Sequence, residues 1–223
     1  MTAGHFGFAA AVKFPAPRAP LWALMFGTYL LDVVFIVLAA AGVESFQPLD
    51  PSHPMYGQVV IHAYYTHSLV GAVMIAIVAG LIARRAWGNS SGVIIGAVVF
   101  SHWILDLIVH RPDLPILPGD LGQLPLLGFG LWRWPAVSAV VELALGIGGA
   151  CLYYIRVRTV TRGRPTASSR AVIAAATTGL LILLLLAADV LGFSIVVAMG
   201  LILLLIVWCG WLDARISRAM SVR

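Results

Sequence analysis

Two apolar runs near the end of the chain, LLILLLLAA at 180–188 and LILLLIVW at 201–208, decide the fold class. Each lies within a stretch of about 20 apolar residues, the length that an α-helix needs to cross a bilayer. A break near Gly192 separates the two stretches, which predicts a transmembrane hairpin with spans at 171–190 and 192–212. Because the runs are nearly featureless, we expect this C-terminal hairpin (171–212) to be a lipid-facing scaffold.

The composition extends this prediction to the whole chain. Of the 223 residues, 61% are hydrophobic and 10% are charged, and the mean hydropathy is +0.99, whereas soluble domains contain roughly 25% charged residues. Further apolar stretches predict spans at about 20–42, 63–83, 92–110 and 135–155. We therefore expect an all-α, polytopic integral membrane protein of about six transmembrane helices. It would form a single membrane domain over 1–223, with its motifs within 4–142.

Lysine and arginine indicate the orientation of these helices, because cytoplasmic loops carry an excess of both residues. With six spans, only Arg111 and Arg133 lie on one side. The other side carries Lys13, Arg18, Arg84, Arg85, Arg156, Arg158, Arg162, Arg164, Arg170, Arg215, Arg218 and Arg223. Both termini should therefore be cytoplasmic. The basic residues behind the net charge of +5 then indicate topology and can contact anionic membrane lipids. We expect no nucleic-acid partner.

The outer connections and the third span carry the polar residues. The connections 44–61 and 111–134 are long and rich in proline, as functional lids often are. The third span reads SHWILDLIVH at 101–110. Steps of four place His102, Asp106 and His110 on one helix face. His102 and His110 are roughly 12 Å apart along the helix axis, so Asp106 would bind a metal with either neighbour, or two metals would share it.

Other ionisable residues fall at a similar depth. His62 and His67 would point about 140° apart on one continuous helix, so they converge only if His62 precedes the helix. Asp32 lies in the first span and Glu142 in the fourth, both in the half of the membrane that also holds His67 and the third-span cluster. Because ionisable residues inside a membrane are costly, their convergence in depth indicates a site.

Imidazole and carboxylate groups are the ligands that zinc uses in catalytic sites. Cys151 and Cys209 form no C-x-x-C pair, so neither a disulfide framework nor a thiolate site is expected. Two alternatives to a metal stay open. His and Asp side chains hydrogen-bond between membrane helices without any metal, and they also line proton or ion pathways.

At these residues the chain resembles the bacterial inner-membrane proteins called membrane-bound metal-dependent hydrolases. The matching segments are Gly4-His5, Leu31-Asp32, His62-Ala63-Tyr64-Tyr65-Thr66-His67-Ser68 and Ser101-His102-Trp103-Ile104-Leu105-Asp106, with a proline-rich continuation to Pro118. The resemblance covers roughly residues 4–118. It implies a divalent metal, zinc with manganese as the alternative, and a distant similarity to zinc-dependent phospholipase C. It also implies that His5 is a ligand, although the expected topology places His5 on the opposite side unless 6–14 re-enters the membrane as a short helix.

The sequence departs from the family pattern at several positions. Leu31 replaces a proline and Val34 a second aspartate, while Ala63 and Tyr64 replace arginine and glycine. These changes would mean fewer metals, a changed substrate, or a site that binds without catalysing.

The expected function is metal-dependent hydrolysis of a phosphoester or other lipid-linked bond near the outer leaflet. His67, His102 and Asp106 would be the core ligands, with Asp32, His62 and His110 in support. Glu142 or Asp113 would move the proton. A non-catalytic membrane subunit or scaffold is the first alternative. A small ion or proton transporter is the second, although a transporter predicts polar residues in the inner half, where this sequence has almost none.

Overall fold

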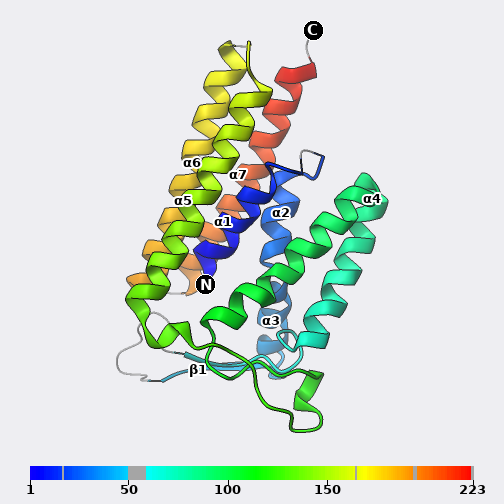
Figure 1. The fold of residues 1–223 in the computed structure, drawn as a ribbon, viewed down its shortest axis with the longest axis vertical. Helices are drawn as coiled ribbons and strands as arrows, with labels where there is room; N and C mark the ends of the chain where they lie inside the picture. The colour runs from blue at the N-terminus through cyan, green and yellow to red at the C-terminus, as the bar shows by residue number, and fades with distance from the viewer. Residues whose placement is uncertain (17, 50–58, 164, 193–194, 222–223) are drawn as a thin grey trace.

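The computed structural model describes residues 1–16, 18–49, 59–163, 165–192 and 195–221. This part of the chain is mostly helical, as the composition predicts, and Figure 1 shows its arrangement. The α-helices are α1 (Thr2–Val12), α2 (Leu21–Thr28), α3 (Leu30–Ala40), α4 (Leu69–Val109), α5 (Pro135–Val160), α6 (Pro165–Val190) and α7 (Ile195–Ser221). Within the described residues, four helices are long and apolar enough to cross a membrane, or five if the bent pair α2–α3 is one span. A membrane protein is thus supported, whereas the expected count of six spans is not confirmed.

The expected spans 63–83 and 92–110 both lie in α4, which folds back on itself (Figure 1). The chain turns at Gly88, where φ is +84° and ψ is 171°, a conformation that L side chains rarely adopt. The two arms of the hairpin approach each other at glycines. A Cβ on Gly80 would lie 3.0 Å from the carbonyl oxygen of Gly92, and a Cβ on Gly96 would lie 3.1 Å from that of Ala76. Small residues therefore bring the backbones of the two arms together.

The first expected span, 20–42, is not one straight helix. It is divided at Tyr29 into α2 and α3, which are bent by 47°. The break has two consequences for polar groups. It leaves the carbonyl of Thr28 at the end of α2, and it puts Asp32 in the first turn of α3, where the helix dipole stabilises a carboxylate.

Helix α1 is buried, and it lies before the first of the six spans predicted from the sequence. It packs mainly against α5 and also contacts α2, α4 and α6. The helices α1 and α5 meet at Gly7 and Gly149, where a Cβ on either residue would meet the backbone of the other helix. Because no side chain fits between the helices at these positions, the two backbones are in direct contact there.

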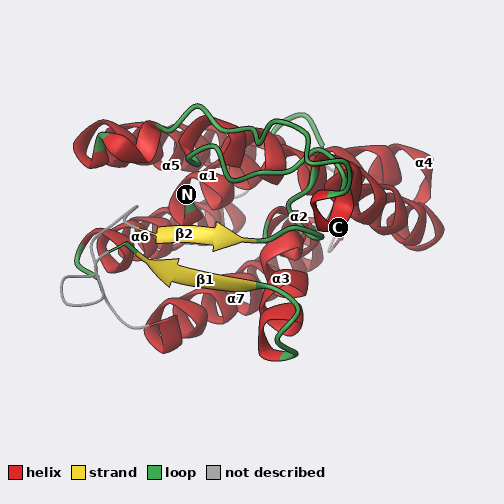
Figure 2. Ribbon diagram, turned by 90° about the horizontal axis from the view of Figure 1, so that it is seen from below, coloured by secondary structure: helices red, strands yellow, loops and turns green. Residues whose placement is uncertain are grey.

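A two-stranded antiparallel sheet, which the sequence did not predict, covers one end of the helices (Figure 2). Strand β1 (Ser45–Pro48) pairs with β2 (Val59–His62); residues 50–58 of this proline-rich connection lie outside the described residues. The second connection, with the 3-10 helices η1 (Pro118–Asp120) and η2 (Leu131–Arg133), lies at the same end. Its carbonyl oxygens at Pro115 and Ile116 accept hydrogen bonds from the first amides of α4, which a helix cannot satisfy internally.

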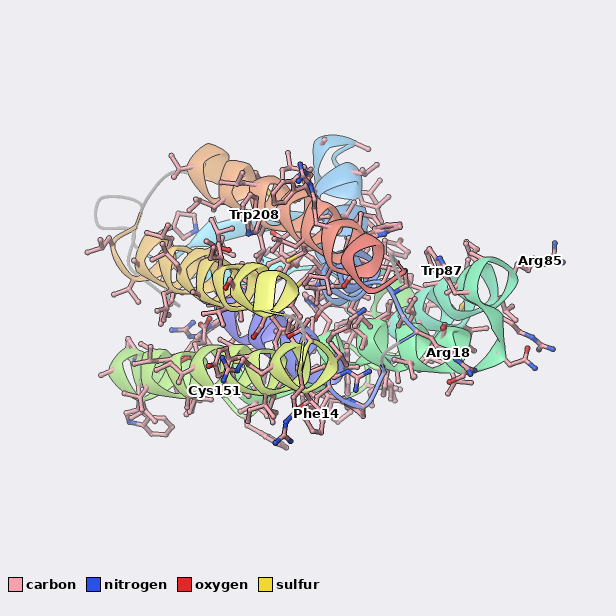
Figure 3. The ribbon with its side chains drawn as sticks, turned by 90° about the horizontal axis from the view of Figure 1, so that it is seen from above. Phe14, Arg18, Arg85, Trp87, Cys151 and Trp208 are labelled. Atoms are coloured by element: carbon pink, nitrogen blue, oxygen red, sulfur yellow. The ribbon has the colours of Figure 1, made fainter. Side chains whose placement is uncertain are left out.

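The opposite end of the molecule carries the turn of α4 and the last turns of α5 and α7 (Figure 1). Here Lys13 Nζ lies 3.0 Å from Asp213 Oδ2, which also accepts a hydrogen bond of 2.6 Å from the backbone amide of Leu21. This pair ties the connection between α1 and α2 to α7. Figure 3, the view onto this end, labels Arg18 and Arg85 among its basic residues.

Candidate metal centre

Six ionisable side chains meet in the half of the molecule near the sheet. Five are at most 3% exposed, and Asp32 is the most open, with 27% of its side chain exposed. They come from four parts of the chain: His5 from α1, Asp32 from α3, His67 from the turn before α4, and His102, Asp106 and the C-cap residue His110 from α4. The expected second span began at residue 63, but α4 begins at Leu69. His67 therefore lies on a turn, not on a helix face.

The proton of His102 lies on the ring nitrogen that faces away from the cluster. Its Nδ1 is 2.7 Å from the carbonyl oxygen of Thr28, which can only accept a hydrogen bond. Nδ1 must therefore carry a proton, and in the neutral ring Nε2 keeps a lone pair. The break between α2 and α3 makes this contact available. A carbonyl that orients the outer nitrogen of a histidine is typical of metal-binding imidazoles.

His67 is fixed in the same tautomer by two residues. Thr66 Oγ1 lies 2.8 Å from Glu44 Oε2, and because a carboxylate accepts, the hydroxyl donates to it. The same hydroxyl oxygen lies 2.9 Å from His67 Nδ1 and accepts that nitrogen's proton. The Nε2 of His67 therefore also presents a lone pair to the cluster.

His110 repeats the pattern with a carboxylate. Its Nδ1 donates to Asp113 Oδ1 at 2.9 Å, which again leaves Nε2 without a proton. That Nε2 is 3.7 Å from Asp106 Oδ2, beyond hydrogen-bond distance. The ring also lies 4.4 Å from that of Trp132. His110 is thus oriented beside the cluster but is less tightly engaged than His67 and His102.

Two carboxylate oxygens converge on the Nε2 atoms of His67 and His102, which lie 3.3 Å apart. Asp32 Oδ1 is 3.4 Å from His67 Nε2 and 3.6 Å from His102 Nε2. Asp106 Oδ2 is 3.6 and 3.0 Å from the same two atoms. Zinc–nitrogen bonds of about 2.0–2.1 Å at tetrahedral angles separate two ligand atoms by about 3.3 Å. The two nitrogens together with either carboxylate oxygen are therefore spaced as three ligands of one metal ion would be.

The charges of the cluster also fit a cation. In the described part of the chain, the side chains within 4 Å of the Asp32 and Asp106 carboxylates that can carry a positive charge are all histidines, which are charged only when protonated. Two carboxylates and several lone pairs facing one another in a buried site repel, and buried charge without compensation costs several kcal/mol. A divalent ion would neutralise the two carboxylates. The donor set of imidazole and carboxylate fits zinc, and manganese less closely.

His5 joins the cluster from α1. Its Nε2 lies 3.0 Å from Asp106 Oδ1, and its ring stacks on that of His102 at a centroid distance of 3.9 Å. The expected topology had put His5 on the far side, and the structure corrects this because α1 is a short buried helix. His5, His102 and Asp106 form a second set of converging ligands. The two sets share His102, whose Nδ1 is occupied, so His102 can serve only one ion.

A cavity of about 590 Å³ opens onto the cluster, within the range of roughly 300–1,000 Å³ typical of small-molecule sites. His5, Asp32, His67, Asp106 and His110 reach it. The rest of the wall is largely apolar and aromatic: Met1, Tyr29, Phe35, Ile36, Ala39, Ala40, Phe46, Ile61 and Trp132, with Thr2 and Asp189. An amphiphile with its polar part at the cluster fits this lining.

Two of the sequence-predicted residues are placed elsewhere. His62 ends β2, and its Nδ1 lies 3.0 Å from the hydroxyl of Tyr64; it is not among the residues that line the cavity. Glu142 is fully buried in α5 and accepts a hydrogen bond of 3.2 Å from the amide of Gly4 near the start of α1. Glu142 therefore holds α1 in place and does not line the cavity.

Glu44 and Thr66, which fix His67, were not among the site residues predicted from the sequence. Glu44 comes shortly after the apolar run of the first predicted span, so the sequence alone indicates only a residue at the end of that span. The Thr66-His67-Ser68 sequence was the available signal, because a hydroxyl beside a ligand histidine often orients it.

No protein-family model matches the chain, and neither a curated protein nor a solved structure is significantly similar to it. The functional interpretation therefore depends on the residues and their geometry.

Proposed function

We propose that this chain is a metal-dependent membrane hydrolase that cleaves a phosphoester or another lipid-linked bond. One observation carries the proposal. At the inner end of a largely apolar cavity, the lone pairs of His67 and His102 lie 3.3 Å apart with carboxylate oxygens of Asp32 and Asp106 beside them. Two buried carboxylates need a positive charge beside them, and a divalent ion held by the two imidazoles would supply it, most readily zinc, with manganese as the alternative.

A bound divalent ion would lower the pKa of a water molecule towards neutrality and supply a nucleophile. The residues of the chain would do the rest. His67, His102 and Asp106 bind the ion, and the more open Asp32 completes the set on the cavity side. His110 accepts the proton released in the reaction, and Asp113 keeps its Nε2 turned towards the cluster.

The lining of the cavity supports a lipid substrate. Phe35, Ile36, Ala39 and Ala40 form one wall on α3, and Phe46 from β1 continues it. These residues would hold an acyl or similar chain, while the scissile bond lies at the cluster. Recognition of such a chain would be mainly hydrophobic, at about 25 cal/mol per Å² of apolar surface buried.

The orientation in the membrane belongs to the same proposal. If the two arms of α4 cross separately and the α2–α3 pair crosses once, the chain has six spans and its C-terminus is cytoplasmic. The expected cytoplasmic N-terminus does not fit this arrangement, because Met1 lines the cavity beside the cluster. The basic end then faces the cytoplasm, as the positive-inside rule requires. The cluster and the sheet lie towards the outer leaflet of a bacterial inner membrane.

The test compares two aspartates that line the same cavity. Asp106→Asn removes a carboxylate that contacts four histidines, whereas Asp189→Asn changes a carboxylate outside both ligand sets. Elemental analysis of the purified proteins should find near-stoichiometric zinc or manganese in the wild type and Asp189→Asn protein and little in Asp106→Asn. Hydrolysis of phospholipids and lipid phosphates in nanodiscs should require the bound metal.

Absence of metal from the wild-type protein, even after divalent ions are added, would contradict the proposal. The cluster would then be an interhelical hydrogen-bond network, and a non-catalytic subunit or scaffold would be the better assignment.

A further inference from the structure

Glu44 is a buried carboxylate beside the cluster that belongs to neither ligand set. It is 3% exposed, and its two oxygens accept three hydrogen bonds from a single turn. Oε1 accepts from the backbone amides of Tyr65 at 2.7 Å and Thr66 at 2.9 Å, and Oε2 accepts from the Thr66 hydroxyl at 2.8 Å. These three hydrogen bonds offset the desolvation that makes a buried carboxylate costly, so the turn is shaped to hold a carboxylate at this position.

We propose that Glu44 is a positioning residue for the metal centre and acts through Thr66 on the tautomer of His67. The inference rests on the proposed function, since it concerns a ligand of the proposed metal. Glu44 accepts the Thr66 hydroxyl proton, so the hydroxyl oxygen is free to accept a proton only from His67 Nδ1. The direction of these two hydrogen bonds keeps the proton off His67 Nε2, the nitrogen that faces Asp32 and His102.

The shape of the turn has supports that do not involve Glu44. Ser68 Oγ donates to the carbonyl of Tyr65 at 2.9 Å and accepts from the amide of Gly71 at 3.0 Å. Trp103 Nε1 donates to the carbonyl of His67 at 2.9 Å. What depends on Glu44 alone is the direction of the hydrogen bonds that reach the His67 ring.

Glu44→Gln tests this direction with almost no change in shape. The glutamine carbonyl can replace Oε1 and accept from the two amides, which places the glutamine NH₂ group opposite the Thr66 hydroxyl. The hydroxyl must then accept from that group and donate to His67 Nδ1, which moves the ring proton to Nε2. Thr66→Val removes the connection without inverting it, and Thr66→Ser keeps it.

The experiment measures zinc affinity by competition with a chelator in nanodiscs, and the ring tautomer by NMR of protein with ¹⁵N-labelled histidine. Outer partners of metal-binding histidines change affinity about 10–100-fold. We expect a loss of about 100-fold in Glu44→Gln, about 10-fold in Thr66→Val and less than roughly 3-fold in Thr66→Ser. In metal-free Glu44→Gln protein, the His67 proton should be on Nε2.

Equal zinc affinity in the wild type and Glu44→Gln protein would overturn this inference and leave the proposed function intact, because metal would still bind. Weaker zinc binding in Glu44→Gln protein with the His67 proton still on Nδ1 would also overturn the inference, because Glu44 would then only stabilise the fold. If Glu44→Gln does not fold, the Thr66→Val and Thr66→Ser pair makes the same distinction. A wild-type protein that binds no zinc would instead refute the proposed function itself.

Discussion

Replacing His110 with alanine should separate proton transfer from metal binding. The Nε2 of His110 is 3.7 Å from the nearest carboxylate oxygen, whereas the atoms around His67 and His102 are 3.0–3.6 Å apart. His110→Ala protein should therefore retain its metal. Removal of a general base typically costs about 10²–10⁴-fold in rate, or about 3–5 kcal/mol in the barrier.

The assay pairs the initial rate of hydrolysis of a fluorogenic lipid phosphoester in nanodiscs with the metal content of the same sample. The missing ring would leave a space that adjoins the cavity beside Trp132, so added imidazole should enter it and restore part of the rate. His62→Ala is the matched control, because that imidazole contacts Tyr64 and does not line the cavity. Metal lost in proportion to activity, with no rescue by imidazole, would show that His110 is a ligand and refute this division of roles.

Three further outcomes follow from the geometry. Asp32→Asn should weaken zinc binding at least about tenfold, because Asp32 Oδ1 lies 3.4 Å from His67 Nε2; unchanged affinity in a chelator competition would remove Asp32 from the ligand set. Acid should release the metal, because protons compete with it for the imidazole nitrogens. Dialysis below about pH 5, well under the ordinary histidine pKa of about 6.5, should leave the protein metal-free. Metal retained at about pH 4 would contradict imidazole ligation. Gly149→Ala should destabilise the protein by about 1–3 kcal/mol, as overpacking does, because its methyl group would meet the carbonyl of Gly7. Gly148→Ala, where nothing lies within 4 Å of the added carbon, should leave the melting temperature nearly unchanged, and equal effects of the two would refute the close approach of α1 and α5.

Sequence periodicity predicted part of the cluster because some of its members belong to one regular element. His102 and Asp106 are four residues apart on α4, and their side chains meet at 3.0 Å. The depth of Asp32 and His67 followed from counting along the apolar spans. The bend at Tyr29 did not, because a single glycine near it, Gly27, does not by itself specify a break in an apolar span. It depends on tertiary contacts, among them the hydrogen bond from His102 to the carbonyl of Thr28.

His5 and Glu44 show why the remainder could not be predicted. The basic residues Lys13 and Arg18 mark one side of the membrane, and the expected topology assigned the whole preceding segment to that side. An 11-residue helix is only about 16 Å long and cannot span the bilayer, yet α1 is buried against α5 through glycine contacts that sequence periodicity does not show. Glu44 lies where a span should end, and its burial depends on a turn about 20 residues later.

The pairing of the first helix with α5 has a consequence for biosynthesis. Gly4 and Glu142, which join these helices by a hydrogen bond, are 138 residues apart in the chain. At about 5–20 residues per second, roughly 7–28 s pass between the synthesis of Gly4 and that of Glu142. His5 can take its place beside Asp106 only after that time, so the centre is assembled late in translation. A chain released before α5 is complete would lack the helix against which α1 packs, and so would not hold His5 beside Asp106.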